Sequence, residues 1–206
     1  MRLASSLVAL AVVACAHSAA NAQPGTSPST AMNIPPAEQQ ITAAVLALPK
    51  EFRDGATVLG YAGKPDKLTT LRAGKGPFIC LASDPKATRF HVACYHRSLE
   101  AFMARGRELR ANGVTGEKVD TVRFAEIKSG KLAMPKQAAT LYQLSGKIDA
   151  FDAATGTAPT ATPLFVIYIS GATSESTGLS AIPVQGGPWI MFPGTPKAHI
   201  MLVPKM

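Results

Sequence analysis

The segment PFICLASDPKATRFHVACYHRSLEAFMARGRELRANG, residues 77–113, decides the fold of this chain. Two apolar runs, residues 77–82 and 90–96, flank a polar turn with an Asp-Pro pair, and this pattern is typical of a β-hairpin. Apolar residues then recur at helical spacing after Ser98, whose hydroxyl suits an N-cap, and Gly113 ends the run. The segment therefore predicts two paired strands followed by a helix.

Two cysteines lie on the predicted strands of this hairpin. Side chains alternate between the faces of a strand, so a turn centred on Asp84 brings Cys80 and Cys94 opposite each other. A bond between them closes a loop of 15 residues, counted from 80 to 94 inclusive, and would stabilise the fold by about 3 kcal/mol in the chain-entropy model. Because cysteine pairs of exported proteins are usually oxidised, we predict a disulfide that staples the hairpin.

A metal site is the alternative interpretation of the same stretch. Cysteine and histidine are zinc ligands, and the stretch holds Cys80, His91, Cys94 and His96. Strand alternation points His91 away from Cys94 and His96, and the spacing matches no common zinc motif. We therefore predict no metal and no cofactor, with Cys80, Cys94 and His96 as the alternative ligand set.

The first 22 residues carry the features of an export signal. Met1-Arg2 gives a short positive start, residues 3–14 are apolar but too few to span a bilayer, and Ala20-Asn21-Ala22 is a small-x-small cleavage site. We predict a signal peptide over residues 1–22. The mature chain, which would begin at Gln23, is then periplasmic or secreted and has no transmembrane span.

A second targeting pattern overlaps the first. Val12-Val13-Ala14-Cys15 resembles a bacterial lipobox, so the alternative is a lipoprotein that is anchored to the envelope through Cys15. Residues 23–36 are rich in Pro, Ser and Thr, and we expect them to form a disordered linker, which suits a tether as well as a free N-terminus. In either case Cys80 and Cys94 are the cysteines that remain for a disulfide.

The chain of 206 residues carries a formal net charge of +8, and its basic residues are spread through the middle of the sequence. The helix predicted after Ser98 carries Arg105, Arg107 and Arg110, and acidic residues are interspersed among them. No aromatic residue lies between these arginines to stack on a base. We interpret these arginines as a solvated helix face and expect no specific nucleic-acid binding.

Residues 37–206 are expected to form a single α+β globular domain. Outside the opening segment, helices are predicted over residues 37–48 and 117–128, and strands over residues 56–61, 67–72, 164–169, 189–192 and 198–203. Residues 137–144 fit a strand and a helix equally well. The predicted class is an α+β fold with an antiparallel or mixed β-sheet, two to three helices and one disulfide-stapled hairpin.

The sequence contains no nucleophile elbow, zinc-protease motif, P-loop or dinucleotide-binding motif. His96 and His199 are the candidates for catalysis, and His199 with Trp189 is the candidate for a binding pocket, because a rigid Pro-Gly-Thr-Pro turn lies between them. We predict an exported, non-catalytic binding or structural domain. The sequence does not identify its partner, and a component of the cell envelope is the candidate. The alternative is a small metal-dependent or histidine-using hydrolase of the periplasm.

Overall fold

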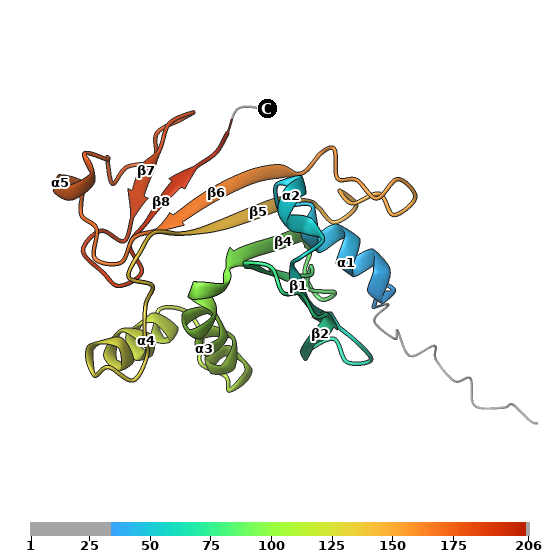
Figure 1. Ribbon diagram of the computed structural model, residues 1–206, viewed down its shortest axis with the longest axis horizontal. Helices are drawn as coiled ribbons and strands as arrows, with labels where there is room; N and C mark the ends of the chain where they lie inside the picture. The colour runs from blue at the N-terminus through green and yellow to red at the C-terminus, as the bar shows by residue number, and fades with distance from the viewer. Residues whose placement is uncertain (1–33, 205–206) are drawn as a thin grey trace, which may run out of the picture. The chain divides into compact units, whose positions relative to one another are not determined.

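The computed structural model of the protein describes residues 34–204. Its strands are β1 (Thr57–Tyr61), β2 (Leu68–Arg72), β3 (Phe78–Leu81), β4 (Arg89–His96), β5 (Ala139–Lys147), β6 (Thr162–Tyr168), β7 (Trp189–Met191) and β8 (His199–Leu202). They form one sheet in the order β2-β1-β3-β4-β5-β6-β8-β7 (Figure 1). Neighbouring strands are antiparallel, except for the parallel pair of β1 and β3. The predicted signal peptide, Cys15 and most of the predicted linker lie outside the described residues.

Five α-helices and one 3-10 turn accompany the sheet in residues 34–204. They are α1 (Ala37–Val45), α2 (Lys50–Arg53), η1 (Arg97–Leu99), α3 (Glu100–Ala111), α4 (Lys118–Lys128) and α5 (Ser174–Thr177). The α+β class with a mixed sheet is confirmed, but the predicted number of two to three helices is wrong. The two helices that were missed, α2 and α5, have four residues each and are too short to repeat an apolar period. No helix in this part of the chain has the length and apolar character needed to cross a membrane.

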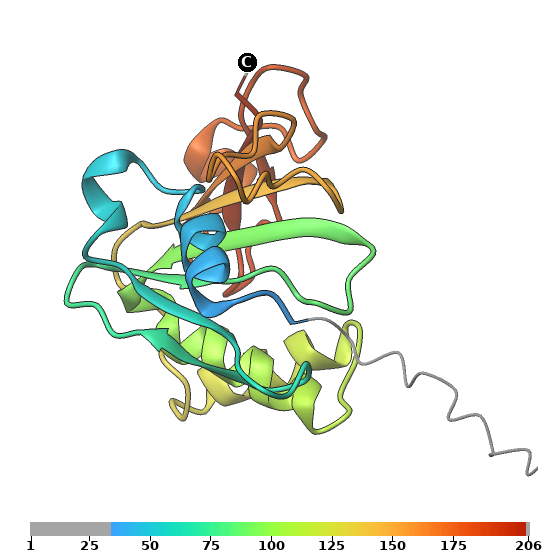
Figure 2. The ribbon, with the colours of Figure 1, turned by 90° about the vertical axis from the view of Figure 1, so that its right-hand side faces the viewer.

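The two faces of the sheet are covered by different helices. On one face α1 packs over the half that holds β1, β3 and β4, and a core forms around Val58, Phe78 and Val92. On the other face α3 and α4, which lie side by side in Figures 1 and 2, cover a second core around Tyr95 and Phe102. Most residues of β3 and of the second half of β4 are therefore buried on both faces, whereas β5 remains half-buried along most of its length.

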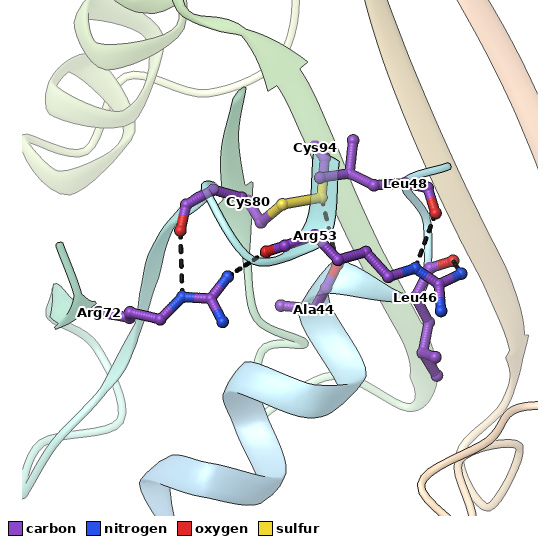
Figure 3. The surroundings of a disulfide bond; sticks show 8 residues. Ala44, Leu46, Leu48, Arg53, Arg72, Cys80 and Cys94 are labelled. Carbon is purple, nitrogen blue, oxygen red and sulfur yellow. Dashed lines mark hydrogen bonds between the residues drawn. A yellow bond between two sulfur atoms is a disulfide. The ribbon is translucent and has the colours of Figure 1, made fainter. Parts of the chain in front are cut away.

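The predicted disulfide joins β3 to β4. Cys80 and Cys94 are paired residues of the antiparallel register, both side chains are fully buried, and their sulfur atoms are bonded (Figure 3). The Sγ atom of Cys94 lies 3.2 Å from the carbonyl oxygen of Ala44 in α1. The prediction of a stapled hairpin is confirmed, and the staple also forms part of the surface on which α1 packs.

Three arginines bind backbone carbonyl groups instead of carboxylates. Arg53 donates to the carbonyl oxygens of Leu46 and Leu48 at the end of α1, and Arg72 donates to residues that lead into β1 (Figure 3). Arg97 donates to carbonyl oxygens of the connection between β2 and β3. These guanidinium groups therefore supply hydrogen bonds to carbonyl oxygens of the irregular segments around β1, which have no partners in a regular hydrogen-bond ladder.

The start of α3 differs from the prediction. His96 precedes the 3-10 turn η1, and its Nδ1 atom accepts a hydrogen bond from the backbone N–H of Ser98 at 3.3 Å. Ser98 thus lies inside this turn, and the residue at the N-cap of α3 is Leu99. The prediction of Ser98 as N-cap is wrong because the extra turn moves the first residue of α3 to Glu100.

Candidate functional site

A cavity of about 310 Å³ opens between the start of α1, the turn that joins β3 to β4, and the segment that follows β5. Its walls are largely apolar: Pro35, Ala43, Pro85, Phe90, Ile148 and Phe151. Gln39, Gln40, Ser83 and Asp84 add a few polar groups. Small-molecule sites of proteins have volumes that begin near ~300 Å³ and combine apolar walls with few polar groups. We refer to this hollow as the apolar cavity.

Two phenylalanines give the apolar cavity a rigid wall. The rings of Phe90 and Phe151 are nearly parallel, at an angle of 11° and a centroid distance of 6.2 Å, and Phe90 is buried. Ile148, on the same segment as Phe151, leaves 61% of its surface exposed. Ile148 therefore adds exposed apolar surface to the wall of the cavity.

Gln40, the buried polar residue of the cavity, already forms hydrogen bonds within the protein. The side-chain amide of Gln40 donates to the carbonyl oxygens of Pro35 and Tyr61, and its oxygen accepts the backbone N–H of Tyr61 at 2.9 Å. Gln40 therefore fixes α1 to β1. Asp84 differs, because its Oδ1 atom accepts the N–H of Lys86 while its Oδ2 atom has no hydrogen-bond partner in residues 34–204.

A second hollow lies on the other side of Asp84. It is a wide groove of about 830 Å³ between the turn that joins β1 to β2 and the C-terminal half of α3. Its charged residues are Lys64, Asp66, Lys67, Asp84, Lys86, Arg107, Glu108 and Arg110. We refer to it as the basic groove.

Only some cations of the basic groove are neutralised. Arg107 is bound by Glu100 at 2.8 Å, and Lys86 lies 3.8 Å from Asp66. For the remaining three, Lys64, Lys67 and Arg110, no carboxylate lies within 4 Å in the described part of the chain.

Tyr61 adds a neutral hydrogen-bond donor to the basic groove. Burial, aided by the negative charge of Asp84, raises the pKa of the Tyr61 phenol to about 12. The hydroxyl therefore keeps its proton at neutral pH. Together with the unneutralised cations, this phenol can donate hydrogen bonds to an anion.

The predicted binding residue His199 lies at the far end of the sheet. It is buried, and its ring contacts those of Tyr168 and Phe192 at centroid distances of 4.9 and 5.6 Å. The Nδ1 atom lies 2.7 Å from the carbonyl oxygen of Lys197, to which it donates as a neutral imidazole. Burial lowers the pKa of His199, so the ring stays neutral at physiological pH.

A cluster of three charged side chains, Asp120, Arg123 and Lys197, lies near His199 at this end of the sheet. Asp120 in α4 accepts hydrogen bonds from Lys197 and from the buried Arg123. Arg123 also donates to the carbonyl oxygen of Phe102 in α3 and lies over the Phe102 ring. Burial alone would raise the pKa of Asp120, but the hydrogen bonds and charges of Lys197 and Arg123 outweigh it and lower the pKa. The cluster ties α3, α4 and the start of β8 together.

Trp189 and His199, the predicted binding residues, share a face of the sheet. Trp189 is paired with Met201 and His199 with Met191, so the two side chains are diagonal neighbours on β7 and β8. Trp189 is buried, and its indole N–H has no hydrogen-bond partner among the residues that the structure describes. The cavities described above are not lined by Trp189 or His199.

The structure does not bring His96 and His199 together. His96 is paired with Phe78 and packs on its ring, on the face that α1 covers, whereas His199 packs on Tyr168 on the face of α3 and α4. The sulfur atoms of Cys80 and Cys94 are bonded to each other, so neither is a free thiolate beside His96. Across residues 34–204, no three His, Cys, Asp or Glu side chains are grouped to hold a metal ion.

Comparison of the chain with protein-family models, curated protein sequences and solved structures found no match. The two hollows beside Asp84 are the candidate binding sites of the molecule. Neither hollow is evident from the sequence, because the walls of each come from three separate segments. The one local indication was the apolar pair Ile148 and Phe151 in a loop otherwise rich in polar and small residues.

Proposed function

We propose that this protein is an exported, non-catalytic binding protein of the cell envelope and that its ligand occupies the apolar cavity. The observation that carries this proposal is the apolar wall of Phe90 and Phe151 beside the exposed Ile148. A cavity of this size with apolar walls suits a small ligand with a hydrocarbon or ring portion.

Export is supported by two features of different kinds. The N-terminal sequence up to Ala22 has the composition of a signal peptide, and the disulfide between Cys80 and Cys94 fits an oxidising compartment. Intact mass of the protein from its host's envelope tests this part. A lipid-free chain that starts at Gln23 supports soluble export, a lipid on Cys15 supports the anchored form, and an uncleaved chain contradicts both.

Binding can be tested with N-phenyl-1-naphthylamine, a neutral apolar dye that fluoresces when it leaves water. We expect a saturable rise in fluorescence with one site per chain. The variant Ile148→Asp places a charge at the rim and should weaken binding by at least tenfold, because an ionised carboxylate beside an apolar ligand must be desolvated.

Ile182→Asp is the matched control, since Ile182 is also an exposed isoleucine, at 74%, and does not line the cavity. Its dye affinity should equal that of the wild type. Absence of saturable binding, or an equal loss in both variants, would contradict the proposed cavity.

A further inference from the structure

The apolar cavity and the basic groove meet at a single turn. Ser83 and Pro85 line the cavity, Lys86 lines the groove, and Asp84 lines both. The two hollows are also linked through Gln40, a cavity residue whose amide holds the backbone of the groove residue Tyr61. The hollows therefore adjoin at Asp84, and a ligand long enough to pass over this turn would reach both.

The charge of the basic groove favours an anion. Five basic and three acidic side chains line it, and salt bridges already engage Arg107, Glu108 and the pair of Lys86 and Asp66. Three cations, Lys64, Lys67 and Arg110, then face one unpaired carboxylate, that of Asp84. The unpaired cations therefore outnumber the unpaired carboxylate, so the groove carries a net positive charge.

Hydrogen-bond donors are present beside these cations. The phenol of Tyr61 lines the same groove and is held in its protonated form. Lysine ammonium, guanidinium and phenol groups are the donors with which proteins bind phosphate and carboxylate oxygens. Asp84, at the junction, accepts hydrogen bonds, so a hydroxyl group suits the part of a ligand that crosses the turn.

We infer that the ligand is an amphiphile with an anionic head, whose hydrocarbon part fills the apolar cavity while its phosphate or carboxylate binds Lys64, Lys67 and Arg110 in the basic groove. This inference rests on the proposed function, because it takes the cavity as the site of the apolar part. It adds the chemical class of the ligand and the residues that select it.

Isothermal titration calorimetry with three ligands of equal chain length separates the contribution of the head group to the affinity from that of the hydrocarbon chain. Decyl phosphate, decanol and decyltrimethylammonium are compared at low salt and below the concentrations at which they aggregate. Decyl phosphate should bind about tenfold more tightly than decanol, and decyltrimethylammonium should bind more weakly than decanol. The advantage of decyl phosphate should shrink as salt is added, because the groove is open to solvent.

The double variant Lys64→Gln and Lys67→Gln should lose most of the preference for decyl phosphate and keep its affinity for decanol, since two exposed ion pairs together account for about five- to tenfold in affinity. The matched control is Lys128→Gln with Lys136→Gln, which removes the same charge from exposed positions outside both hollows. The control should retain the preference.

The outcomes distinguish this inference from the proposed function. Equal, salt-independent affinities for decyl phosphate and decanol would overturn the anionic head and leave the cavity in place. No binding of any of the three would overturn both.

Vesicles identify the source of the anionic head. Co-sedimentation with phosphatidylglycerol vesicles, but not with phosphatidylcholine vesicles, alongside decyl phosphate binding supports the inference and places the ligand in a bilayer. Decyl phosphate binding without co-sedimentation supports it with a free amphiphile as ligand. Co-sedimentation without decyl phosphate binding would overturn it, because the groove would then bind headgroups alone.

Discussion

Asp120 and Lys197, which are 77 residues apart in the sequence, are joined by a hydrogen bond of 2.7 Å between Nζ and Oδ2. The bond links α4 to the residues that lead into β8. Since Arg123 shares the same carboxylate from a buried position, the last strands of the sheet are held to the helical layer by an ionic contact as well as by apolar packing.

Replacement of Asp120 by Asn should lower the free energy of unfolding by about 3 kcal/mol, because it leaves the buried Arg123 guanidinium without its counter-charge. Urea unfolding followed by circular dichroism measures the change. Asp149→Asn is the control, as Asp149 is exposed and forms no salt bridge within residues 34–204, and its stability should match that of the wild type. Equal stabilities of the two variants would contradict this role of Asp120.

His199 should make stability depend on pH. Burial lowers its pKa in the folded state below the ordinary value of 6.5, so the unfolded chain binds the proton more readily. The stabilisation that neutral His199 gives to the folded state is fully present above pH 6.5. It is lost as the pH falls from there through the folded-state pKa of His199. Urea unfolding at a series of pH values should show this loss in the wild type.

His199→Asn keeps a hydrogen-bond donor in place of Nδ1 but cannot titrate. Its stability should change less with pH over the same window. His91→Asn, at an exposed position, serves as control and should retain the slope of the wild type. If the slope survives in His199→Asn, another group is responsible.

The disulfide should account for a large part of the stability. Cys80 and Cys94 are separated by 14 positions, and the chain-entropy model gives a contribution of about 3 kcal/mol for a loop of this size. Urea unfolding with and without a reductant should differ by that amount. A variant with both cysteines replaced by Ala should be destabilised to a similar degree and should not respond to the reductant; a response would show that reduction acts elsewhere.

Gly106 should resist replacement by Ala although it lies within a helix. A Cβ atom at this position would lie 2.9 Å from Nη1 of Arg123, so the buried guanidinium group would have to shift away from the Phe102 carbonyl oxygen and the Asp120 carboxylate that it binds. Helix propensity alone would favour Ala by about 1 kcal/mol, whereas overpacking costs about 1–3 kcal/mol, and we expect a net loss of stability in thermal unfolding. Ala101→Gly, at an exposed position of α3, calibrates the propensity effect, and a gain of stability in Gly106→Ala would contradict the close contact.

Local patterns predicted the middle of the fold well. Strand alternation around the Asp84 turn was enough to place Cys80 opposite Cys94, because both sit on the same short hairpin. The segment that fitted strand and helix equally became β5, since its partners β4 and β6 supply hydrogen bonds on both edges. A local sequence pattern cannot predict these partners, because strand pairing is not determined by the residues of one segment alone.

The candidate sites were harder to predict. His96 and His199 each lie on a strand, but which face of the sheet each occupies depends on the register of the intervening strands. The apolar cavity depends on contact between Phe90 and Phe151, which are brought together by the return of the chain after β5. The ion cluster of Asp120 combines a helix with a turn near the C-terminus, and no spacing rule connects them.

The arginines that bind backbone carbonyl groups give the two ends of the sheet unequal tolerance to acid. Guanidinium groups and carbonyl oxygens do not titrate in the acid range, so the contacts of Arg53, Arg72 and Arg97 around β1 persist when carboxylates are protonated. The contacts of Asp120 with Arg123 and Lys197 near β8 are lost when the Asp120 carboxylate is protonated. Acidification should therefore loosen the molecule from its C-terminal edge. The protection factors of amide hydrogen exchange, which relate each rate to the intrinsic rate at the same pH, should fall in β7 and β8 and be retained in β1 and β3.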